Sequence, residues 1–281
     1  MQSSADKQKL IRAVNKSLSS EERRADELEQ RQYNSLVVKS NVAIQKARYS
    51  LSLQQQKILC YLITELKDTD TKDTEKIFSI KTFYEFMEVG NKDYDKVRQA
   101  LQGIRNKSWW VQDENGVDVL LSFFNTVRCD KRTSRVRIKW HEDMLPYLQN
   151  LRKMFTQYRL WYIMTMKSEY SIRLYELLKS VENKTLWEFS IDELKHKFMC
   201  ENYKQFGHFK SRVIDTAVKE INEKTDITVS YELFKYGDSG RAYTHIEFTI
   251  EPKSAEERIA IDHLIRNELD KNQLTIDDYC Q

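Results

Sequence analysis

An α+β fold made of two similar consecutive units is the prediction from this sequence, and three observations support it. The chain has 281 residues, about the length of two average domains. Helix-like and strand-like hydrophobic periodicities alternate along most of it. The tripeptide Phe-Ser-Ile occurs at 78–80 and again at 189–191, each time between a strand-like and a helix-like stretch. A repeat of about a hundred residues indicates duplicated domains rather than a solenoid.

The composition is that of a folded protein with a hydrated surface. Hydrophobic residues make up 40% of the chain and charged residues 32%, and only 6 Gly and 2 Pro occur. No run approaches the roughly 18 apolar residues of a membrane helix, and the N-terminus lacks the apolar core of a secretory signal. We therefore expect a cytoplasmic protein without a membrane partner. The cysteines are too widely spaced for a zinc or redox motif; they are Cys60, Cys129, Cys200 and Cys280.

Charge and hydrophobicity divide the chain into four segments. Residues 1–35 form a charged N-terminal arm with few apolar anchors. The first domain, 36–150, has 19 Lys and Arg against 15 Asp and Glu, and the second, 151–252, has 16 against 15. An acidic C-terminal tail, 253–281, has 4 against 7. Since the net charge is only +3, any contact with nucleic acid must come from local basic patches.

The first unit begins with a capped helix. Ser52 and Gln55 fit a capping box, S-x-x-Q, and the leucines and isoleucine that follow recur at helical spacing. The predicted order is a helix, a strand, two further helices and a hairpin of two strands. These elements span residues 52–66, 76–80, 81–89, 92–108, 117–128 and 134–140.

The second unit repeats this order. A helix, a strand, a short helix, a long helix and a hairpin are predicted at 171–181, 186–191, 191–199, 208–226 and 227–250. The same succession in both units is that of a winged helix-turn-helix domain, in which a helix-turn-helix is followed by a β-hairpin, the wing. The sequence therefore predicts an α+β fold with two tandem winged helix-turn-helix domains. The joint between them, 141–155, has the apolar pattern of a continuous stiff helix.

The long helix of the second unit has a polar face suited to DNA. At 3.6 residues per turn, Phe209, Val213, Ala217 and Ile221 share one face and are expected in the core. Arg, Lys, Ser and Asn on the opposite face are side chains that contact base edges and phosphates in a major groove. An ordinary solvated helix face is the alternative. The opposite face comprises His208, Ser211, Arg212, Asp215, Lys219 and Asn222.

The third helix of the first unit is richer in amides. Arg98 and Arg105 lie on its flank, where they could reach a DNA backbone. Gln and Asn can pair with adenine, but they are also common on protein-interaction surfaces. The outward face comprises Lys92, Asp95, Lys96, Gln99, Gln102 and Asn106.

Both predicted wings are basic. In the first, six cations fall within twelve residues and are opposed only by Asp130, which favours contact with phosphates. The alternative is edge charge that blocks pairing between sheets. The cations are Arg128, Lys131, Arg132, Arg135, Arg137 and Lys139, and the second wing offers Lys235, Tyr236 and Arg241.

The sequence lacks the motifs of an enzyme. It has no G-x-x-x-x-G-K-[ST] loop for ATP and no G-x-S-x-G elbow. The 5 histidines are scattered singly, so no pair suits the metal site of a replication nuclease. We expect no catalytic residue, no cofactor and no metal.

Several stretches resemble the initiator replication proteins of theta-replicating bacterial plasmids that contain iterons. The resemblance covers about 34–251 and is most specific at 34–66 and 209–232. It implies binding of directly repeated double-stranded origin DNA, opening of the duplex, recruitment of host helicase and initiator proteins, and repression of the chain's own gene by dimers. It assigns dimerisation and further DNA contacts to the first domain, and iteron recognition to the second. The implied recognition residues are Lys210, Ser211, Arg212, Asp215 and Lys219.

Two other functions fit the same residues. A transcriptional repressor without an initiation role would have the same domains. Winged helices also bind proteins, so a protein-interaction module is the second alternative.

Overall fold

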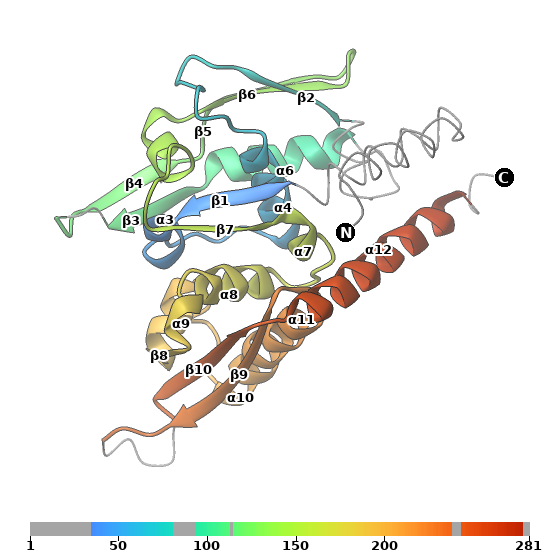
Figure 1. Cartoon of the computed structure of the whole chain (residues 1–281). Helices are drawn as coiled ribbons and strands as arrows, with labels where there is room; N and C mark the ends of the chain where they lie inside the picture. Colours follow the sequence, from blue (N-terminus) through green and yellow to red (C-terminus); the bar gives the residue numbers. More distant parts are fainter. Residues whose placement is uncertain (1–34, 81–93, 113–114, 238–242, 278–281) are drawn as a thin grey trace. The chain divides into compact units, whose positions relative to one another are not determined.

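The computed structural model describes residues 35–80, 94–112, 115–237 and 243–277, and Figure 1 shows their arrangement. The fold is α+β, as predicted. Its strands form two three-stranded and two two-stranded sheets, and every strand pair is antiparallel.

The first unit contains helices packed on a three-stranded sheet of order β2-β6-β5. The predicted capping box is confirmed: Ser52 Oγ accepts from the Gln55 N–H, and the Gln55 side chain accepts from the Ser52 N–H. The elements are β1 (Leu36–Ser40), α3 (Asn41–Gln45), α4 (Leu53–Thr64), β2 (Lys76–Ser79), α6 (Tyr94–Asn106), β3 (Ser108–Gln112), β4 (Asp118–Ser122), β5 (Phe124–Asp130) and β6 (Arg135–Trp140). The helix predicted at 81–89 lies outside the described residues.

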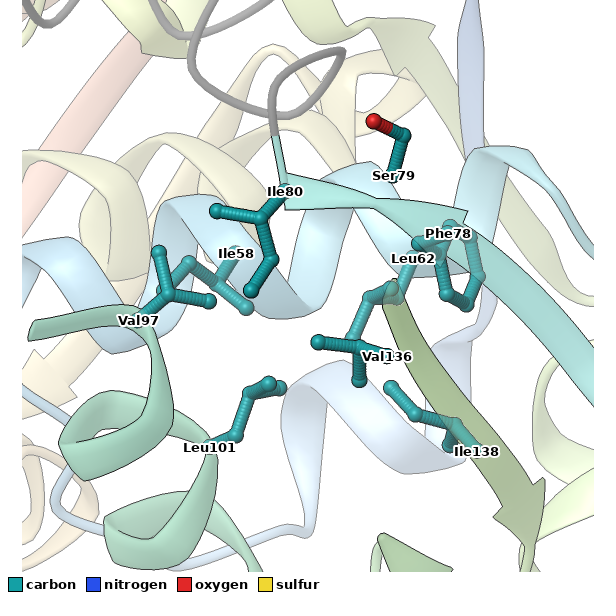
Figure 2. Close-up of a pocket in the computed structure, with 9 residues that line it drawn as sticks. All are labelled: Ile58, Leu62, Phe78, Ser79, Ile80, Val97, Leu101, Val136 and Ile138. Atoms are coloured by element: carbon teal, nitrogen blue, oxygen red, sulfur yellow. The ribbon is translucent and has the colours of Figure 1, made fainter. Parts of the chain in front are cut away.

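The core of this unit lies between α4, α6 and the sheet. Figure 2 shows side chains from these elements converging on a small apolar pocket, among them Ile58, Phe78 and Leu101. The predicted inward positions of β6 are confirmed, since Val136, Ile138 and Trp140 are all buried. The alternation of β6 therefore places Arg135, Arg137 and Lys139 on its other face; the first two are exposed and the lysine is half-buried.

The hairpin predicted from 117–128 and 134–140 is wrong in one respect. The first of these stretches divides at Phe123 into β4 and β5, and only β5 pairs with β6. Strand β4 pairs instead with β3, which was not predicted. The division occurs because the buried Phe123 ring stacks on Trp109 of β3, with ring centroids 5.5 Å apart.

The joint predicted as one helix at 141–155 is not a continuous helix. It contains the short 3-10 helix η1 (Glu142–Tyr147) and then two residues with positive φ, Asn150 at 56° and Met154 at 53°. A left-handed residue cannot continue a right-handed helix. Strand β7 (Phe155–Arg159) follows and pairs with β1, so the chain beyond residue 150 is hydrogen-bonded to the start of the first unit.

The second unit has a three-stranded sheet of order β8-β10-β9, which corresponds to β2-β6-β5 of the first. Four positions predicted to lie in the core of its long helix, Phe209, Val213, Ala217 and Ile221, are 0% exposed. The elements are α7 (Leu160–Met164), α8 (Glu169–Lys179), η2 (Glu182–Lys184), β8 (Leu186–Ser190), α9 (Ile191–Lys197), α10 (Phe206–Phe209), a π-helical segment (Lys210–Asp215), α11 (Thr216–Lys224), β9 (Ile227–Phe234) and β10 (His245–Pro252).

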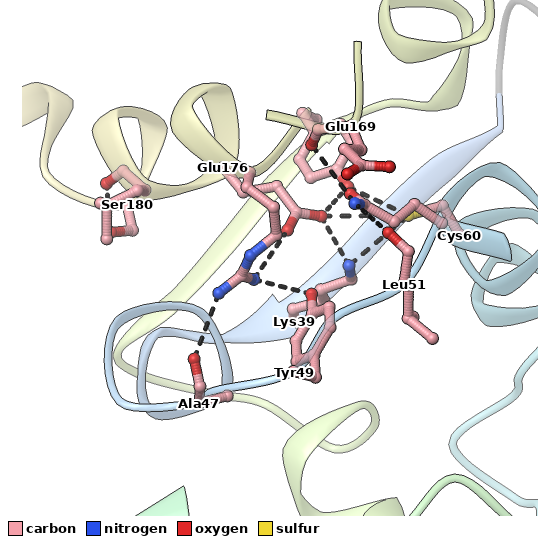
Figure 3. Close-up of polar contacts among 12 residues, drawn as sticks. Lys39, Ala47, Tyr49, Leu51, Cys60, Glu169, Glu176 and Ser180 are labelled. Atoms are coloured by element: carbon pink, nitrogen blue, oxygen red, sulfur yellow. Dashed lines mark hydrogen bonds and ion pairs between the residues drawn. The ribbon is translucent and has the colours of Figure 1, made fainter. Parts of the chain in front are cut away.

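A buried ionic network joins β1 to α8 (Figure 3). Lys39 donates to Glu176, which lies 137 residues further along the chain, and the two side chains are only 6% and 1% exposed. Tyr158 of β7 donates to the same carboxylate oxygen. Cys60 of α4, buried as expected for a thiol in an apolar helix, lies 3.5 Å from the Lys39 Nζ.

Arg173 extends this network to the loop after α3. Its guanidinium lies 3.6 Å from Glu176 and donates to the Tyr49 hydroxyl at 2.7 Å and to the Ala47 carbonyl at 3.2 Å. It also stacks on the Tyr49 ring, 4.2 Å from the centroid. Buried charges are stable only when they are paired and hydrogen-bonded, so these contacts fix α8 against the first unit.

Side chains from two helices hold the connection between α7 and α8. Lys57 of α4 donates to the Met164 carbonyl, and Lys224 of α11 donates to the Thr165 carbonyl. The Glu220 carboxylate accepts from two backbone N–H groups of the same connection, at positions 167 and 168. The connection is thus bonded to elements on both sides of it.

The tail predicted only as acidic forms helix α12 (Ala255–Asp277) over most of its length. Asp262 pairs with Arg159 at 3.0 Å, and Glu268 lies 3.4 Å from Lys224, so its acidic groups meet lysine and arginine of earlier elements. Within the described parts of the chain, no helix is long and apolar enough to cross a membrane. The buried side chains of α12 are Ile261 and Ile265.

We predict that Glu176→Gln lowers the free energy of unfolding by about 3–5 kcal/mol, because it leaves Lys39 buried beside a neutral group. The double variant Lys39→Met/Glu176→Leu removes both charges and should recover most of that loss. Urea unfolding followed by circular dichroism measures both. Glu142→Gln is the matched control, since its pair with Lys72 is exposed and should contribute less than about 1 kcal/mol. A double variant no more stable than Glu176→Gln would contradict the ionic role.

The pH dependence of the same variant gives a second prediction. Burial alone would raise the pKa of Glu176, but Lys39 and Arg173 hold it below the ordinary value of 4.5. A carboxylate with a depressed pKa stabilises the fold above its unfolded pKa, and this contribution is lost as pH falls through the folded pKa. The stability difference between the native chain and Glu176→Gln should therefore be constant near pH 6 and shrink below about pH 4. A difference independent of pH between 3 and 6 would contradict this.

Candidate nucleic-acid interface

The long helix of the second unit presents a polar face. Helix α10, the π-helical segment and α11 follow one another without a break from Phe206 to Lys224. Ser211, Arg212 and Lys219 are exposed, whereas Val213, Ile214 and Ala217 between them are buried. The structure thus places three of the five predicted recognition residues on the solvent side.

The other two predicted residues are bonded to each other. Lys210 Nζ lies 2.9 Å from both carboxylate oxygens of Asp215. The Tyr231 hydroxyl, from strand β9, donates to the same carboxylate. Lys210 and Asp215 therefore compensate each other's charge, and Lys219 lies 3.9 Å from Glu223 in an exposed pair. Arg212 is the remaining predicted recognition residue with a positive charge on this face.

The electrostatics of this group follow from its hydrogen bonds. Partial burial would raise the pKa of Asp215, but the bonds from Tyr231 and Lys210 hold it below the ordinary value. The pKa of Lys210 is raised, by Tyr231 and Asp215 together. Both groups are consequently charged at neutral pH.

The wing of the second unit is the β9–β10 hairpin. Lys235 is exposed at its end, with Nζ 5.2 Å from the centroid of the Tyr243 ring. The Tyr236 hydroxyl donates to Glu188 of β8 at 2.9 Å. The predicted contact Arg241 lies outside the described residues.

In the first unit, α6 presents Lys96, Arg98 and Arg105 to solvent. Arg105 Nε donates to the Asn125 carbonyl of β5 at 3.3 Å, which links this helix to its wing. The predicted contact Lys92 lies outside the described residues.

The first wing is the β5–β6 hairpin, and it carries exposed cations at its turn. Lys131, Arg132 and Arg135 are exposed. Asp130, their only acidic neighbour in the hairpin, shapes the turn: it accepts from the Arg132 N–H at 2.9 Å and from both the N–H and the hydroxyl of Thr133. The hydroxyl of Thr133, more than any other group, holds the pKa of Asp130 below its ordinary value.

Two contacts set the individual roles of the wing cations. Arg128 is paired with Glu75, so its charge is already compensated. Lys131 Nζ lies 6.0 Å from the Tyr94 ring at the start of α6. In the first unit as in the second, the third helix and the wing thus lie side by side.

One residue of this surface was missed from the sequence. The alternation of Tyr231 with Val229 along β9 predicts a core position, yet Tyr231 is half-buried and its hydroxyl bonds the recognition helix. Alternation gives the face of a strand but not what a hydroxyl at its border contacts. Among the described residues, no cluster of three or more His, Cys, Asp or Glu is placed to hold a metal ion.

Two family models match the chain. The model of the initiator replication protein WH1 domain matches residues 36–179, and that of the initiator Rep protein WH2 domain matches residues 190–250.

Individual relatives agree with these matches. A replication initiation protein of Escherichia coli is 26% identical over 188 residues, which cover 63% of this chain and 58% of the relative's length. The chain thus aligns with less than two thirds of that relative. An uncharacterized 27.6 kDa protein of Escherichia coli is 23% identical over 222 residues, covering 73% of this chain and 91% of the relative.

A solved structure has the same fold. The Pi initiator protein, crystallised in complex with iteron DNA, superposes with a TM-score of 0.64 at 15% identity, covering 79% of this chain and 99% of that one. Together with the two family matches, this likeness confirms the predicted tandem winged-helix architecture. The chain belongs to the initiator replication protein family and is built from its WH1 and WH2 domains.

Proposed function

We propose that this protein initiates plasmid replication by binding repeated double-stranded origin DNA, and that both winged helices contact the duplex. The observation that carries the proposal is the exposed pair Ser211 and Arg212, with Lys219, on a helix whose opposite side is buried. A helix of this kind enters the major groove, where an arginine can bond a guanine through two hydrogen bonds. The membership of the family supports this assignment.

The wings supply contacts that do not depend on sequence. Lys131, Arg132 and Arg135 project from a tight turn, and Lys235 occupies the end of the second wing. Cations at hairpin ends suit phosphate oxygens, which position a protein on DNA without selecting bases. On the first domain's helix, Lys96, Arg98 and Arg105 would add backbone contacts.

The contacts between the units support recognition of direct repeats. Glu220 and Lys224 of α11 bond the backbone between α7 and α8, and Tyr175 of α8 donates to Asp226 at the end of α11. These bonds link the part of the chain matched by WH1 to the recognition helix, so we infer that both helices keep one fixed separation. Two helices that enter successive major grooves from one side must lie about 34–36 Å apart. The expected site is then a non-palindromic unit of about 20 base pairs. The Pi initiator, solved with iteron DNA, offers a precedent for such a site.

Further steps of initiation are proposed from the family alone. These are opening of the origin, recruitment of host helicase and initiator proteins, and repression of the chain's own gene by a dimer formed through the first domain. We propose no catalytic role for the chain in these steps, since neither nuclease nor nucleotide-binding motifs occur in its sequence.

We predict specific and strongly salt-dependent binding to a duplex that contains the cognate repeat, because each neutralised phosphate adds about −0.9 to the slope of log affinity against log salt. Lys131→Ala and Arg132→Ala should each weaken binding to all sequences similarly and reduce the slope by about 1. Fluorescence anisotropy between about 50 and 200 mM salt measures both. Arg128→Ala is the matched control: its charge is paired with Glu75, so the slope should not change. A native slope near zero would refute the proposed function.

Arg212→Ala should cost about 1–3 kcal/mol of binding free energy and relax specificity at one or two base pairs. The reason is that a bidentate arginine discriminates its base from the other three. Selection from a randomised duplex library, followed by sequencing, gives the preference at each position. Arg152→Ala, an exposed arginine on the loop before β7, is the control and should leave the preferences intact. Unchanged preferences in Arg212→Ala would show that this face does not contact bases.

A further inference from the structure

The recognition helix is locally wider than an α-helix. Residues Lys210–Asp215 form a π-helical segment, in which a backbone N–H bonds to the carbonyl five residues earlier. In an α-helix, two residues five positions apart point in directions about 140° apart, because each residue turns the chain by about 100°. The widened turn therefore allows Lys210 Nζ to donate hydrogen bonds to both carboxylate oxygens of Asp215. Thr216 shows the same spacing, since its hydroxyl donates to the Ser211 carbonyl at 3.0 Å.

Tyr231 ties this turn to the sheet. Its hydroxyl donates to Asp215, and its ring lies 6.1 Å from the ring of Phe248, which is completely buried in β10. Lys210 Nζ lies 5.5 Å from the centroid of the Tyr231 ring and so contacts both the ring and the carboxylate. Three groups from the helix and the wing thus hold one another in place.

The bonds of Asp215 leave it poorly suited to contact a base. Each of its carboxylate oxygens already accepts at least one hydrogen bond. A contact with cytosine N4 would compete with those bonds. Ser211 and Arg212, in contrast, lie in the same segment and are exposed, and the hydroxyl of Ser211 bonds only weakly within its own helix, at 3.4 Å to the His208 carbonyl.

We propose that Asp215 and Tyr231 are positioning residues that hold the widened turn, and that this turn sets the direction in which Ser211 and Arg212 meet the bases. Lys210 completes the group by neutralising the carboxylate, which would otherwise repel phosphates. The inference rests on the proposed function, because it refines which residues of the helix select the sequence.

The test compares Tyr231→Phe and Asp215→Ala with the native chain by selection from a randomised duplex library. Both variants should lose preference at the base pairs that Arg212→Ala affects, by about tenfold for a lost hydrogen bond to a charged group. The double variant Arg212→Ala/Tyr231→Phe should lose no more there than Arg212→Ala alone, since the two changes act through one contact. Tyr49→Phe is the matched control, because its hydroxyl bonds Arg173 rather than the recognition helix. Its preferences should be native.

A purely structural role of Tyr231 would instead weaken binding to all sequences equally, and that outcome overturns the proposal. A second outcome also overturns it: Asp215→Ala loses preference at a base pair other than the one that Arg212→Ala affects, while Tyr231→Phe keeps native preferences. Asp215 would then contact a base directly. Circular dichroism melting shows that each variant is folded.

Amide hydrogen exchange without DNA separates this inference from the proposed function. The amides of 211–216 should exchange faster in Tyr231→Phe than in the native chain, and at the native rate in Tyr49→Phe. Native exchange in Tyr231→Phe would refute the positioning role whatever the chain binds. If the native chain selects no repeat at all while exchange responds as expected, the proposed function has failed and the structural part of the inference stands.

Discussion

The buried pairing of Lys39 with Glu176 is the interaction on which the packing of β1 against α8 depends. Each charge, taken alone, would cost several kcal/mol to bury, so neither element can keep its position without the other. Because Arg173 adds the loop at Tyr49 and Tyr158 adds β7, four segments distant in sequence are held by one carboxylate. Helix α8 in turn bonds Asp226 at the end of α11, through Tyr175 and Lys179, so the network also supports the packing of the recognition helix.

The acidic side chains near the candidate interface are bonded within the protein. Asp130 forms the turn of the first wing, Glu75 pairs with Arg128, and Asp215 bonds Lys210 and Tyr231. The ion pairs of Glu75 and Asp215 compensate negative charge that would repel phosphates, whereas Asp130 stays charged and forms the turn. This explains how a chain of net charge +3 can present locally positive surfaces. Counting charges in the sequence cannot distinguish cations that are paired with a carboxylate, such as Arg128 and Lys210, from the other arginines and lysines of these surfaces.

Local signals predicted the elements well and failed where distant contacts decide. The Ser52–Gln55 capping box and the alternation of Val136, Ile138 and Trp140 are properties of adjacent residues, and both are confirmed. Strand β3 was missed because its residues directly follow a helical pattern, and only the pairing with β4 makes them a strand. In that strand Trp109 is buried and Trp110 is exposed. In residues 141–155, apolar spacing predicts a helix, but the chain leaves helical geometry at Asn150 and then forms β7, which pairs with β1. In the recognition helix, a fixed 3.6-residue period gave the buried face correctly, but it could not reveal the pairing of Asp215 with Lys210 across the π turn.

The position of Cys60 has a consequence for measuring motion. Its thiol is 1% exposed and lies within 3.5 Å of both the Lys39 ammonium and the Tyr158 hydroxyl. Burial also raises its pKa, so the reactive thiolate is scarce in the closed form. A thiol reagent can reach this sulfur only when β1 and α8 separate. The rate of alkylation at Cys60 therefore reports how often this buried contact between β1 and α8 opens.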